Sequence, residues 1–231
     1  MTNMINISEP PSNLFGKFFY YRRKYSFTHT VCSYVGRYSQ LFWKLVAPIV
    51  TRSHISNWEA TAEHRILNLG GGSNTLDGCL TVDITPRADA YVDITKPLPF
   101  ADNSIDAIFC EEVIEHVELQ LGSQLLKECW RILKPGGVIR LTTPDLNWFA
   151  SGVSQSTITC DEINEIFYNH GHRYLYTQEA LSLNCQEVGF TNLKISKYQD
   201  SDSQLGYLDS HADRFSHPPE MSQYLEAQKS N

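Results

Sequence analysis

Glycine and aspartate residues follow two short apolar runs in the first half of the chain. The first run, Ile66–Leu69, stops at Gly70–Gly72, and the second, Cys79–Val82, ends on Asp83. An apolar run cut off by glycine is typical of a buried strand that enters a tight loop. Glycine lets a ligand lie directly against the backbone. A carboxylate at the end of the second strand binds ribose hydroxyls in doubly wound folds, so the pattern predicts a nucleoside site.

The spacing of these two predicted strands restricts the kind of nucleoside. A dinucleotide fingerprint needs a third glycine and then a helix whose N-terminus faces the pyrophosphate. Thr75 takes the third position, and only Gly70–Gly78 separates the strands, which is below the usual crossover of about a dozen residues. We therefore expect at most one helical turn over Ser73–Gly78. A cofactor without phosphates, such as S-adenosylmethionine, fits this loop.

Six motifs then occur in the order and with the spacing of one known family. They are Asn68–Gly72, Asp83, Asp93 ahead of Leu98–Phe100, Asn103–Ala107, Glu115–Val117 and Arg131–Gly137. Together they resemble a class I S-adenosylmethionine-dependent methyltransferase of the broad type 11 group. Within that group the chain is similar to the short-first-crossover proteins often associated with polysaccharide biosynthesis. The resemblance extends over residues 66–190 and, more weakly, over the C-terminus.

The resemblance implies an α/β fold with a doubly wound, Rossmann-like sheet of seven strands and an antiparallel last strand. We expect a helical extension in residues 1–58 and the methyltransferase domain in residues 59–231. After the first two strands, the apolar runs and breakers predict strands near residues 89–93, 105–110, 138–142, 193–198 and 223–228. They predict helices near residues 123–133, 160–168 and 178–188, the first capped by Ser123 and ended by Lys134–Gly137.

The same resemblance implies a set of cofactor-binding residues. The set is Asn68, Gly70, Gly71, Gly72, Asp83, Ile84, Asp93, Ile94 and Cys110. Asp83 would accept hydrogen bonds from the ribose, Asp93 would bind the adenine amino group, and Ile94 would cover the ring. Asn68 and the glycine backbone would hold the methionine end, although many relatives carry an acid where Asn68 is neutral. The alternative for Asp83 is a capping or surface role, and that for Asp93 is an Asx turn.

Two histidine segments are candidates for the acceptor side. Methyl transfer from a sulfonium depends mainly on holding acceptor, methyl and sulfur in line. An oxygen acceptor usually also needs a base, for which imidazole has a suitable pKa. We expect His172 to be the base or acceptor-orienting group and Arg173 to bind an anionic substrate group. His116 is the second candidate, and the alternative for His172 is a loop histidine bonded to the backbone.

Glu112, Glu115 and His116 form a further polar group. In a helix starting near Glu112 they would share one face, at i, i+3 and i+4. This arrangement resembles the Mg²⁺ ligands of small-RNA 2′-O-methyltransferases and ubiquinone O-methyltransferases, but many relatives carry a similar Glu-His pair without metal. Acids in a first helical turn are also favoured by the helix dipole. We expect no metal, with these three residues as the alternative ligands.

The N-terminal part of the chain is basic and aromatic. Residues 11–55 contain seven Lys and Arg but no Asp or Glu, whereas the whole chain has a net charge of −7. We expect helices near residues 13–26 and 30–46. Three interpretations remain open for this part: a helical cap with solvated cations, a lid over the site, and a surface for anionic lipid or nucleic acid.

Cysteine usage and the N-terminus predict a cytoplasmic protein. The six cysteines form no Cys-x-x-Cys pair, which favours reduced, packed thiols over a disulfide framework. The N-terminus lacks the layout of a signal peptide. Residues 41–50 form the longest apolar-looking run, and they are too few, and interrupted by Lys44 and Pro48, to span a bilayer.

The sequence thus predicts an S-adenosylmethionine-dependent methyltransferase that modifies a hydroxyl of a small-molecule or saccharide-type acceptor. One alternative is a Mg²⁺-assisted O-methyltransferase acting on RNA or a quinol-like lipid. Another is a non-catalytic module that binds S-adenosylmethionine. Nucleic acid is not the expected partner, peripheral membrane contact through the basic N-terminus stays open, and the oligomeric state is not predicted.

Overall fold

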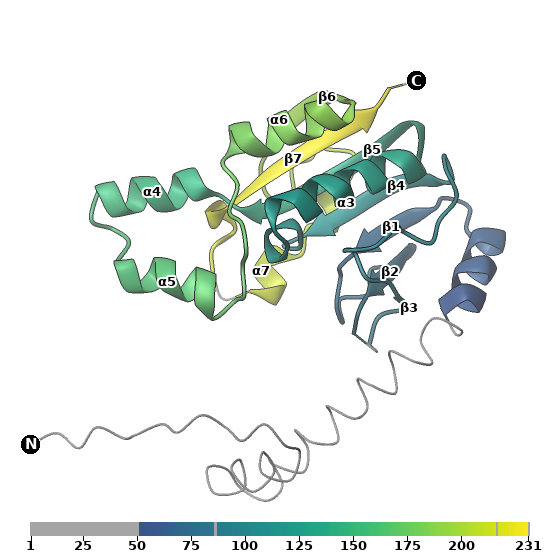
Figure 1. The fold of residues 1–231 in the computed structure, drawn as a ribbon, viewed down its shortest axis with the longest axis horizontal. Coiled ribbons are helices and arrows are strands. Elements are labelled where there is room, and N and C mark those ends of the chain that lie inside the picture. The colour runs from purple at the N-terminus through teal and green to yellow at the C-terminus, as the bar shows by residue number, and fades with distance from the viewer. Residues whose placement is uncertain (1–50, 86, 216, 231) are drawn as a thin grey trace, which may run out of the picture. The chain divides into compact units, whose positions relative to one another are not determined.

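The computed structural model describes residues 51–85, 87–215 and 217–230 (Figure 1). The predicted N-terminal helices, and the choice between cap, lid and surface, concern residues outside this range and stay predictions, as does the division at residue 58. The described part opens with a helix over residues 51–61, where Ile55 is buried in the core and Trp58 packs against it. No helix among the described residues is long and apolar enough to cross a membrane.

The strands of the described part form a seven-stranded sheet in the order β3-β2-β1-β4-β5-β7-β6. They are β1 (Ile66–Leu69), β2 (Cys79–Asp83), β3 (Ala90–Tyr91), β4 (Ile105–Glu111), β5 (Leu133–Pro144), β6 (Phe190–Ser196) and β7 (Ser222–Lys229). Strands β1 to β5 pair in parallel, whereas β7 lies antiparallel between β5 and β6. The predicted doubly wound sheet with an antiparallel last strand is confirmed. The strand order reverses between β1 and β4, where such folds bind their ligands.

Helices and helical turns connect these strands. They are η1 (Ile114–His116), α3 (Leu119–Ile132), α4 (Leu146–Ser154), α5 (Cys160–Tyr168), α6 (Gln178–Val188), η2 (Gly206–Leu208), α7 (His211–Arg214) and η3 (Pro219–Met221). The predicted helices α5 and α6 have the expected end signals. Thr159 and Glu162 form a capping box at the start of α5, and Gly189 ends α6 in the left-handed conformation, with φ of 114°.

The prediction for the helix before β5 was wrong at its start. Helix α3 begins at Leu119, and Ser123 lies inside it, where its hydroxyl donates to the Asn184 side chain at 2.9 Å. At the other end, the chain passes directly into β5. The expected break by Lys134–Gly137 is therefore part of the strand, and Gly136 takes a positive φ of 76° there.

The short crossover between β1 and β2 is confirmed, because residues 73–78 form turns and irregular loop with no helix. A crossover without a helix leaves part of one sheet face uncovered. In this chain the segment between β6 and β7 contributes Leu205 and Leu208 to an apolar cluster with Phe109 of β4 and Val138 of β5. A later part of the chain thus packs on the sheet over these strands.

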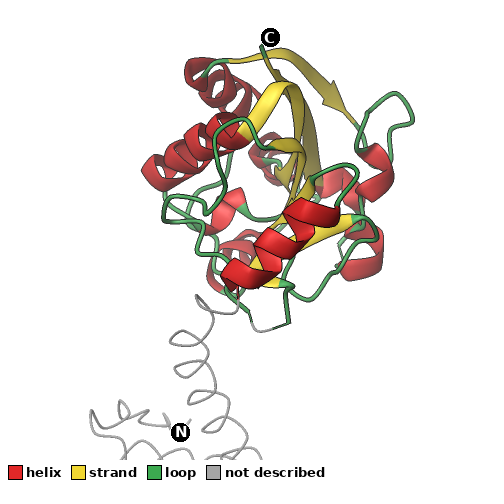
Figure 2. Cartoon of the chain, turned by 90° about the vertical axis from the view of Figure 1, so that its right-hand side faces the viewer, coloured by secondary structure: helices red, strands yellow, loops and turns green. Residues whose placement is uncertain are grey.

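A larger core cluster includes the central strands and the helices α3 and α6. Leu67 and Ile108 of the sheet are completely buried in it, together with Leu126 of α3 and Leu181 of α6. Figure 1 shows α3 and α6 running beside each other over the strands, and Figure 2 shows the strands enclosed by helices and loops. This packing fixes the carboxyl ends of β1, β2 and β4 at one edge of the sheet.

Candidate active site

The glycine loop after β1 lies directly against the segment that follows β4. Gly70 has a φ of 73°, and a Cβ placed on it would lie 2.5 Å from the Cγ2 atom of Val113. No other residue fits this position without displacing Val113. Because β1 and β4 are neighbours in the sheet, a ligand on the glycine loop would lie beside the residues that follow β4.

The Asn68 side chain holds this loop by hydrogen bonds. Its side-chain amide donates to the Asn74 carbonyl at 2.8 Å and to the Thr81 hydroxyl at 3.2 Å, and the residue is only 1% exposed. Asn68 therefore connects the loop to β2. Its predicted role at the methionine end stays a prediction, and the buried position favours an effect through the shape of the loop.

Asp83 stands at the end of β2, as expected for a ribose ligand. Its carboxylate accepts the backbone N–H of Gly72 at 3.2 Å and that of Thr85 at 2.8 Å. The next residue, Ile84, is 56% exposed although it is a large apolar side chain. An exposed apolar side chain next to a carboxylate suits a bound nucleoside, whose ring and hydroxyls need both kinds of contact.

Asp93 is held in its own turn. It accepts from the backbone N–H and the hydroxyl of Thr95 at 3.1 and 2.6 Å, and it pairs with Lys96 at 3.0 Å. Burial opposes ionisation, but these hydrogen bonds and Lys96 lower the pKa of Asp93. The carboxylate thus makes the Asx-turn contacts considered as the alternative, and an adenine contact stays a prediction. Ile94 packs, partly buried, against the core.

Cys110 lies in the middle of the sheet. It is 1% exposed, and burial raises the pKa of its thiol far above the ordinary value. Its thiol is neutral and enclosed, so any cofactor contact by Cys110 would involve its backbone.

A cleft of about 320 Å³ opens beside the ends of β4 and β5. Its lining combines one carboxylate, five imidazoles, five apolar side chains and two neutral polar ones, namely Glu112, His116, Pro144, Phe149, Ile166, Asn169, His170, His172, His211, Phe215, His217, Met221 and Ser222. Five of the chain's eight histidines are in this lining. The cleft is large enough for a small ligand and offers many hydrogen-bonding nitrogens.

His172 lines this cleft, as the sequence predicted for an acceptor-side residue. Its ring centroid is 4.7 Å from that of His116 and 5.8 Å from that of His170. Burial, with His116 and His170 adding to it, lowers the pKa of His172 to about 4. The ring is neutral at pH 7. Arg173, in contrast, is exposed and outside the cleft lining, and its backbone N–H donates to the Glu115 carbonyl at 2.7 Å.

Glu115 lies beneath the two histidines, with its side chain completely buried. One carboxylate oxygen, Oε2, accepts the Thr143 hydroxyl at 2.9 Å. The other, Oε1, lacks a hydrogen-bond partner among the described residues. It lies 3.7 Å from His116 Nε2 and 3.9 Å from His172 Nε2. Burial and the nearby Glu112 raise the pKa of Glu115 well above its usual range.

The helical face expected for Glu112, Glu115 and His116 is absent from this segment. Glu112 has a φ of 55°, rare for a residue with a side chain, and the only helical turn there is the short η1. Glu112 accepts the Ser222 hydroxyl at 2.8 Å and lies 3.8 Å from His211 Nδ1. Burial opposes the protonation of His211, but Glu112 outweighs it and raises the pKa of His211. Strained backbone of this kind is common at functional sites.

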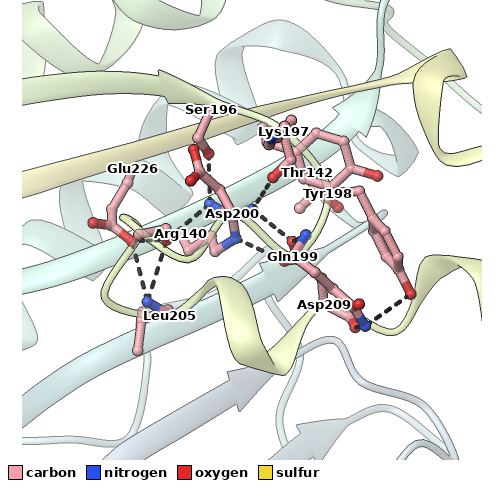
Figure 3. Close-up of polar contacts among 12 residues, drawn as sticks. Arg140, Thr142, Ser196, Lys197, Tyr198, Gln199, Asp200, Leu205, Asp209 and Glu226 are labelled. Carbon is pink, nitrogen blue, oxygen red and sulfur yellow. Dashed lines mark hydrogen bonds and ion pairs between the residues drawn. The ribbon is translucent and has the colours of Figure 1, made fainter.

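His211 and His217 belong to the β6–β7 segment, which we define as residues 197–221, and which Arg140 of β5 holds in place. The Arg140 guanidinium is completely buried and makes two hydrogen bonds of 2.6 Å to Asp209 (Figure 3). It also donates to Ser196, Ser203 and the Lys197 carbonyl. Ser203 in turn donates to Glu226, which accepts the Leu205 backbone N–H at 3.2 Å.

The same segment contacts the glycine loop. Glu111, at the end of β4, accepts the Ser210 backbone N–H at 2.8 Å, the Ser210 hydroxyl at 2.6 Å and Arg214 at 2.8 Å. The Asn74 side chain donates to the Ser210 hydroxyl at 2.9 Å. One polar network therefore connects the predicted cofactor loop to the residues that line the cleft.

Comparisons with known proteins agree with this architecture. The methyltransferase domain family matches residues 81–141, which extend from β2 to β5. A probable S-adenosylmethionine-dependent methyltransferase of Mycolicibacterium smegmatis is 39% identical over 67 residues, 29% of this chain and 25% of that protein. These matches cover a quarter of this chain or slightly more, and they agree with a class I methyltransferase fold.

Solved structures of methyltransferases share the fold of this chain. An S-adenosylmethionine-dependent methyltransferase of Archaeoglobus fulgidus matches with a TM-score of 0.51 and 16% identity, over 83% of this chain and 100% of that one. A Haemonchus contortus phosphoethanolamine N-methyltransferase 2, solved with S-adenosyl-L-methionine, matches with a TM-score of 0.51 and 16% identity, over 78% of this chain and 53% of that one. The chain thus spans a quarter of the Mycolicibacterium protein and about half of the Haemonchus one.

Several residues of the cleft were not predicted from the sequence. They are Phe149, Ile166, His170, His211, Phe215, His217, Met221 and Ser222. His170 lies two positions before the predicted His172. For His211, Phe215 and His217, the available signal was their own segment, which contains two histidines, Arg214 and Phe215 within seven positions. Nothing in that segment alone indicates that it folds back over β4.

Proposed function

We propose that the chain transfers a methyl group from S-adenosylmethionine to a small-molecule acceptor bound in the histidine-lined cleft. The observation that supports this most is the contact between Gly70 and Val113. It brings a loop suited to the cofactor beside Glu112 and His116, which line the cleft. Holding donor and acceptor next to each other supplies most of the catalysis in this kind of transfer.

For the cofactor, we propose that Asp83 binds the ribose hydroxyls, that Ile84 and Ile94 contact the adenine ring, and that the Gly70–Gly72 backbone holds the methionine end. The exposed position of Ile84 and the placement of Asp83 at a strand end favour these roles. The absence of a helix over residues 73–78 favours a cofactor without a pyrophosphate.

For the acceptor, we propose a neutral, hydroxyl-bearing molecule of saccharide type or similar size. Imidazoles supply hydrogen bonds to hydroxyls, and Phe149 and Phe215 supply apolar surface for a ring. The exposed Arg173 is outside the cleft lining, which weakens its predicted role in holding an anionic group.

In the proposed reaction, the carbon–sulfur bond of the sulfonium breaks as the acceptor oxygen forms a bond to the methyl carbon. The hydroxyl proton leaves to a base. The neutral ring of His172 offers a lone pair in the cleft and would orient the hydroxyl or take its proton, with His116 as the second candidate.

A screen with methyl-labelled S-adenosylmethionine tests the proposal. The full chain would be incubated with pools of glycans, small alcohols and phenols, amines, quinol-like lipids and RNA, and label transfer would be measured. Label on a glycan or small hydroxyl compound is the expected result. Label only on amines, lipid or RNA would contradict the acceptor class, and cofactor binding without any transfer would favour a non-catalytic binding module.

A further inference from the structure

We propose that Ser210 of the β6–β7 segment is a positioning residue for the glycine loop, residues 70–78, and so for the methyl donor. Its hydroxyl lies between the Asn74 side chain of this loop and the Glu111 carboxylate at the end of β4. The β6–β7 segment would thereby replace the helix that follows such a loop in other doubly wound folds. The effect on S-adenosylmethionine rests on the proposed function, whereas the support of the loop does not.

The glycine loop has little support of its own. A binding loop must be held to within about 0.5 Å of its productive position, but residues 73–78 form no helix that could anchor it. The Asn74 backbone N–H donates to the Gly71 carbonyl at 2.9 Å, and the Asn68 side chain donates to the Asn74 carbonyl at 2.8 Å. These bonds close the turn and connect its backbone to β1. The Asn74 side chain takes its partner from a distant part of the chain.

The Ser210 hydroxyl is this partner, although it is 136 positions away in the sequence. It accepts the Asn74 side-chain amide at 2.9 Å and donates to Glu111 Oε2 at 2.6 Å. A serine hydroxyl has one proton to donate and can accept at the same time, so both of its functions are used here. Alanine at this position would remove both hydrogen bonds, whereas threonine can keep both.

Glu111 fixes the position of Ser210. Its side chain is completely buried, and it accepts the Ser210 backbone N–H and the Arg214 guanidinium, each at 2.8 Å. The guanidinium is always charged, and hydrogen bonds with a charged partner are about twice as strong as neutral ones. Because β4 lies between β1 and β5, the contact from Glu111 through Ser210 to Asn74 ties the loop to the centre of the sheet.

The apolar contacts of the β6–β7 segment give a second, independent argument. Leu205 and Leu208 are buried in a cluster with Phe109 and Val138 of the sheet, and Leu76 of the glycine loop packs against the same cluster. Helices normally provide such cover on both faces of a parallel sheet. The β6–β7 segment therefore supplies the apolar cover as well as the polar contact that a helix after β1 would provide.

The first measurement needs no cofactor. Amide hydrogen exchange of the full chain, followed by mass spectrometry over residues 70–78, reports how firmly the loop is held. We expect Ser210→Ala and Asn74→Ala each to speed exchange in this stretch. Ser201→Ala is the matched control, because Ser201 is an exposed serine of the same segment, and it should leave exchange over residues 70–78 unchanged.

The second measurement is S-adenosylmethionine affinity by isothermal calorimetry, at a temperature where melting curves show every variant to be folded. Ser210→Ala and Asn74→Ala should each weaken binding by about 3–10-fold, the effect of one hydrogen bond. The double variant should lose no more than either single one, because all three remove the same contact. Ser210→Thr, which keeps the hydroxyl, and Ser201→Ala should bind like wild type. A purely structural role would lower the melting temperature and leave the affinity of the folded variants unchanged.

The outcomes separate this inference from the proposed function. Wild-type affinity, or wild-type exchange over residues 70–78, in the folded Ser210→Ala and Asn74→Ala variants would overturn the inference and leave the proposed function standing. Losses that multiply in the double variant would also overturn it, because Asn74 and Ser210 would then act separately. Faster exchange in a chain that does not bind S-adenosylmethionine would support Ser210 as the anchor of the loop and refute the proposed function.

Discussion

Asp83 is the single residue on which cofactor binding should depend most. Its carboxylate is at the end of β2 and already orders the Gly72 and Thr85 backbone. We predict that Asp83→Ala weakens S-adenosylmethionine binding by about 1–3 kcal/mol, the range for leaving polar partners unpaired. Isothermal calorimetry measures this, with Asp102→Ala as control, because the Asp102 side chain is exposed and pairs with Arg131 of α3. An unchanged affinity would remove Asp83 from the ribose site.

His172 should affect turnover and leave cofactor binding intact. It lines the cleft, whereas the predicted cofactor residues are absent from the cleft lining and lie in or just after β1 to β4. We predict that His172→Ala lowers kcat by about 10²–10⁴-fold, the usual contribution of a positioned acid–base group, with unchanged S-adenosylmethionine affinity. Turnover assays with the acceptor identified by the labelling screen measure it, and His64→Ala serves as control. Normal turnover in the mutant would make His116 the next candidate.

His211 should make stability depend on pH. Glu112 and Glu111 face its ring from the end of β4 and outweigh the effect of burial, so that the pKa of His211 is raised in the folded state. A raised folded pKa means that the folded chain holds the proton more tightly than the unfolded one. The resulting stability is fully present below the unfolded pKa of about 6.5 and is lost as pH rises through the folded value.

We therefore predict that His211→Asn costs more unfolding free energy at pH 5.5 than at pH 9. Urea unfolding of both proteins at the two pH values measures the difference. The same cost at both pH values would mean that His211 contributes through packing against Phe215 and not through its charge.

At the scale of elements, apolar runs and the residues that interrupt them predicted the strands. They did not predict boundaries that depend on packing between distant parts of the chain. Ile66–Leu69 was predicted with its observed ends because glycines stop it. Ser123 has the chemistry of a cap, but packing of Gly122 and Leu125 extends α3 toward its N-terminus. Pro135 and Gly136 usually end a strand, and here they lie where the register between β4 and β5 shifts, between Leu133 and Val138. From Val138 onward β5 pairs with β4 on one side and β7 on the other.

Arg140 should be the main support of the β6–β7 segment. It and Asp209 are both completely buried and hydrogen-bonded to each other. Removing one partner leaves an uncompensated buried charge, which costs about 3–5 kcal/mol. We predict a loss of that order in unfolding free energy for Arg140→Met and for Asp209→Leu, each measured by denaturant titration.

The double variant should lose less than the sum of the two, because it removes both charges at once. Lys96→Ala, which breaks the exposed pair with Asp93, is the control and should change stability little. Additive losses in the double variant would mean that Arg140 and Asp209 act independently.

At the scale of the whole molecule, the two halves of the site differ in how far the sequence predicts them. Apart from Cys110, the predicted cofactor residues lie at strand ends within residues 66–94. They are close together in the sequence, so their motifs can be recognised from it. The cleft joins residues after β4 to His172 and to His211, almost a hundred positions beyond Glu112. His172 was predicted because a motif contains it, whereas His211 depends on the Arg140–Asp209 contact, which no local pattern encodes.

Cofactor binding should stabilise the described domain as one unit. The glycine loop connects to β2 through Asn68, to β4 through Val113 and to the β6–β7 segment through Asn74 and Ser210. A ligand that binds only the folded chain adds RT ln(1 + [L]/Kd) to the free energy of unfolding, about 2.7 kcal/mol at a hundredfold excess over Kd.

We predict a single melting transition that shifts upward with S-adenosylmethionine concentration in the wild type. The shift should need a higher concentration in Asp83→Ala. A second transition whose melting temperature does not change with the cofactor would show that the β6–β7 segment unfolds separately. A wild-type melting temperature that does not change at all would contradict cofactor binding by the glycine loop.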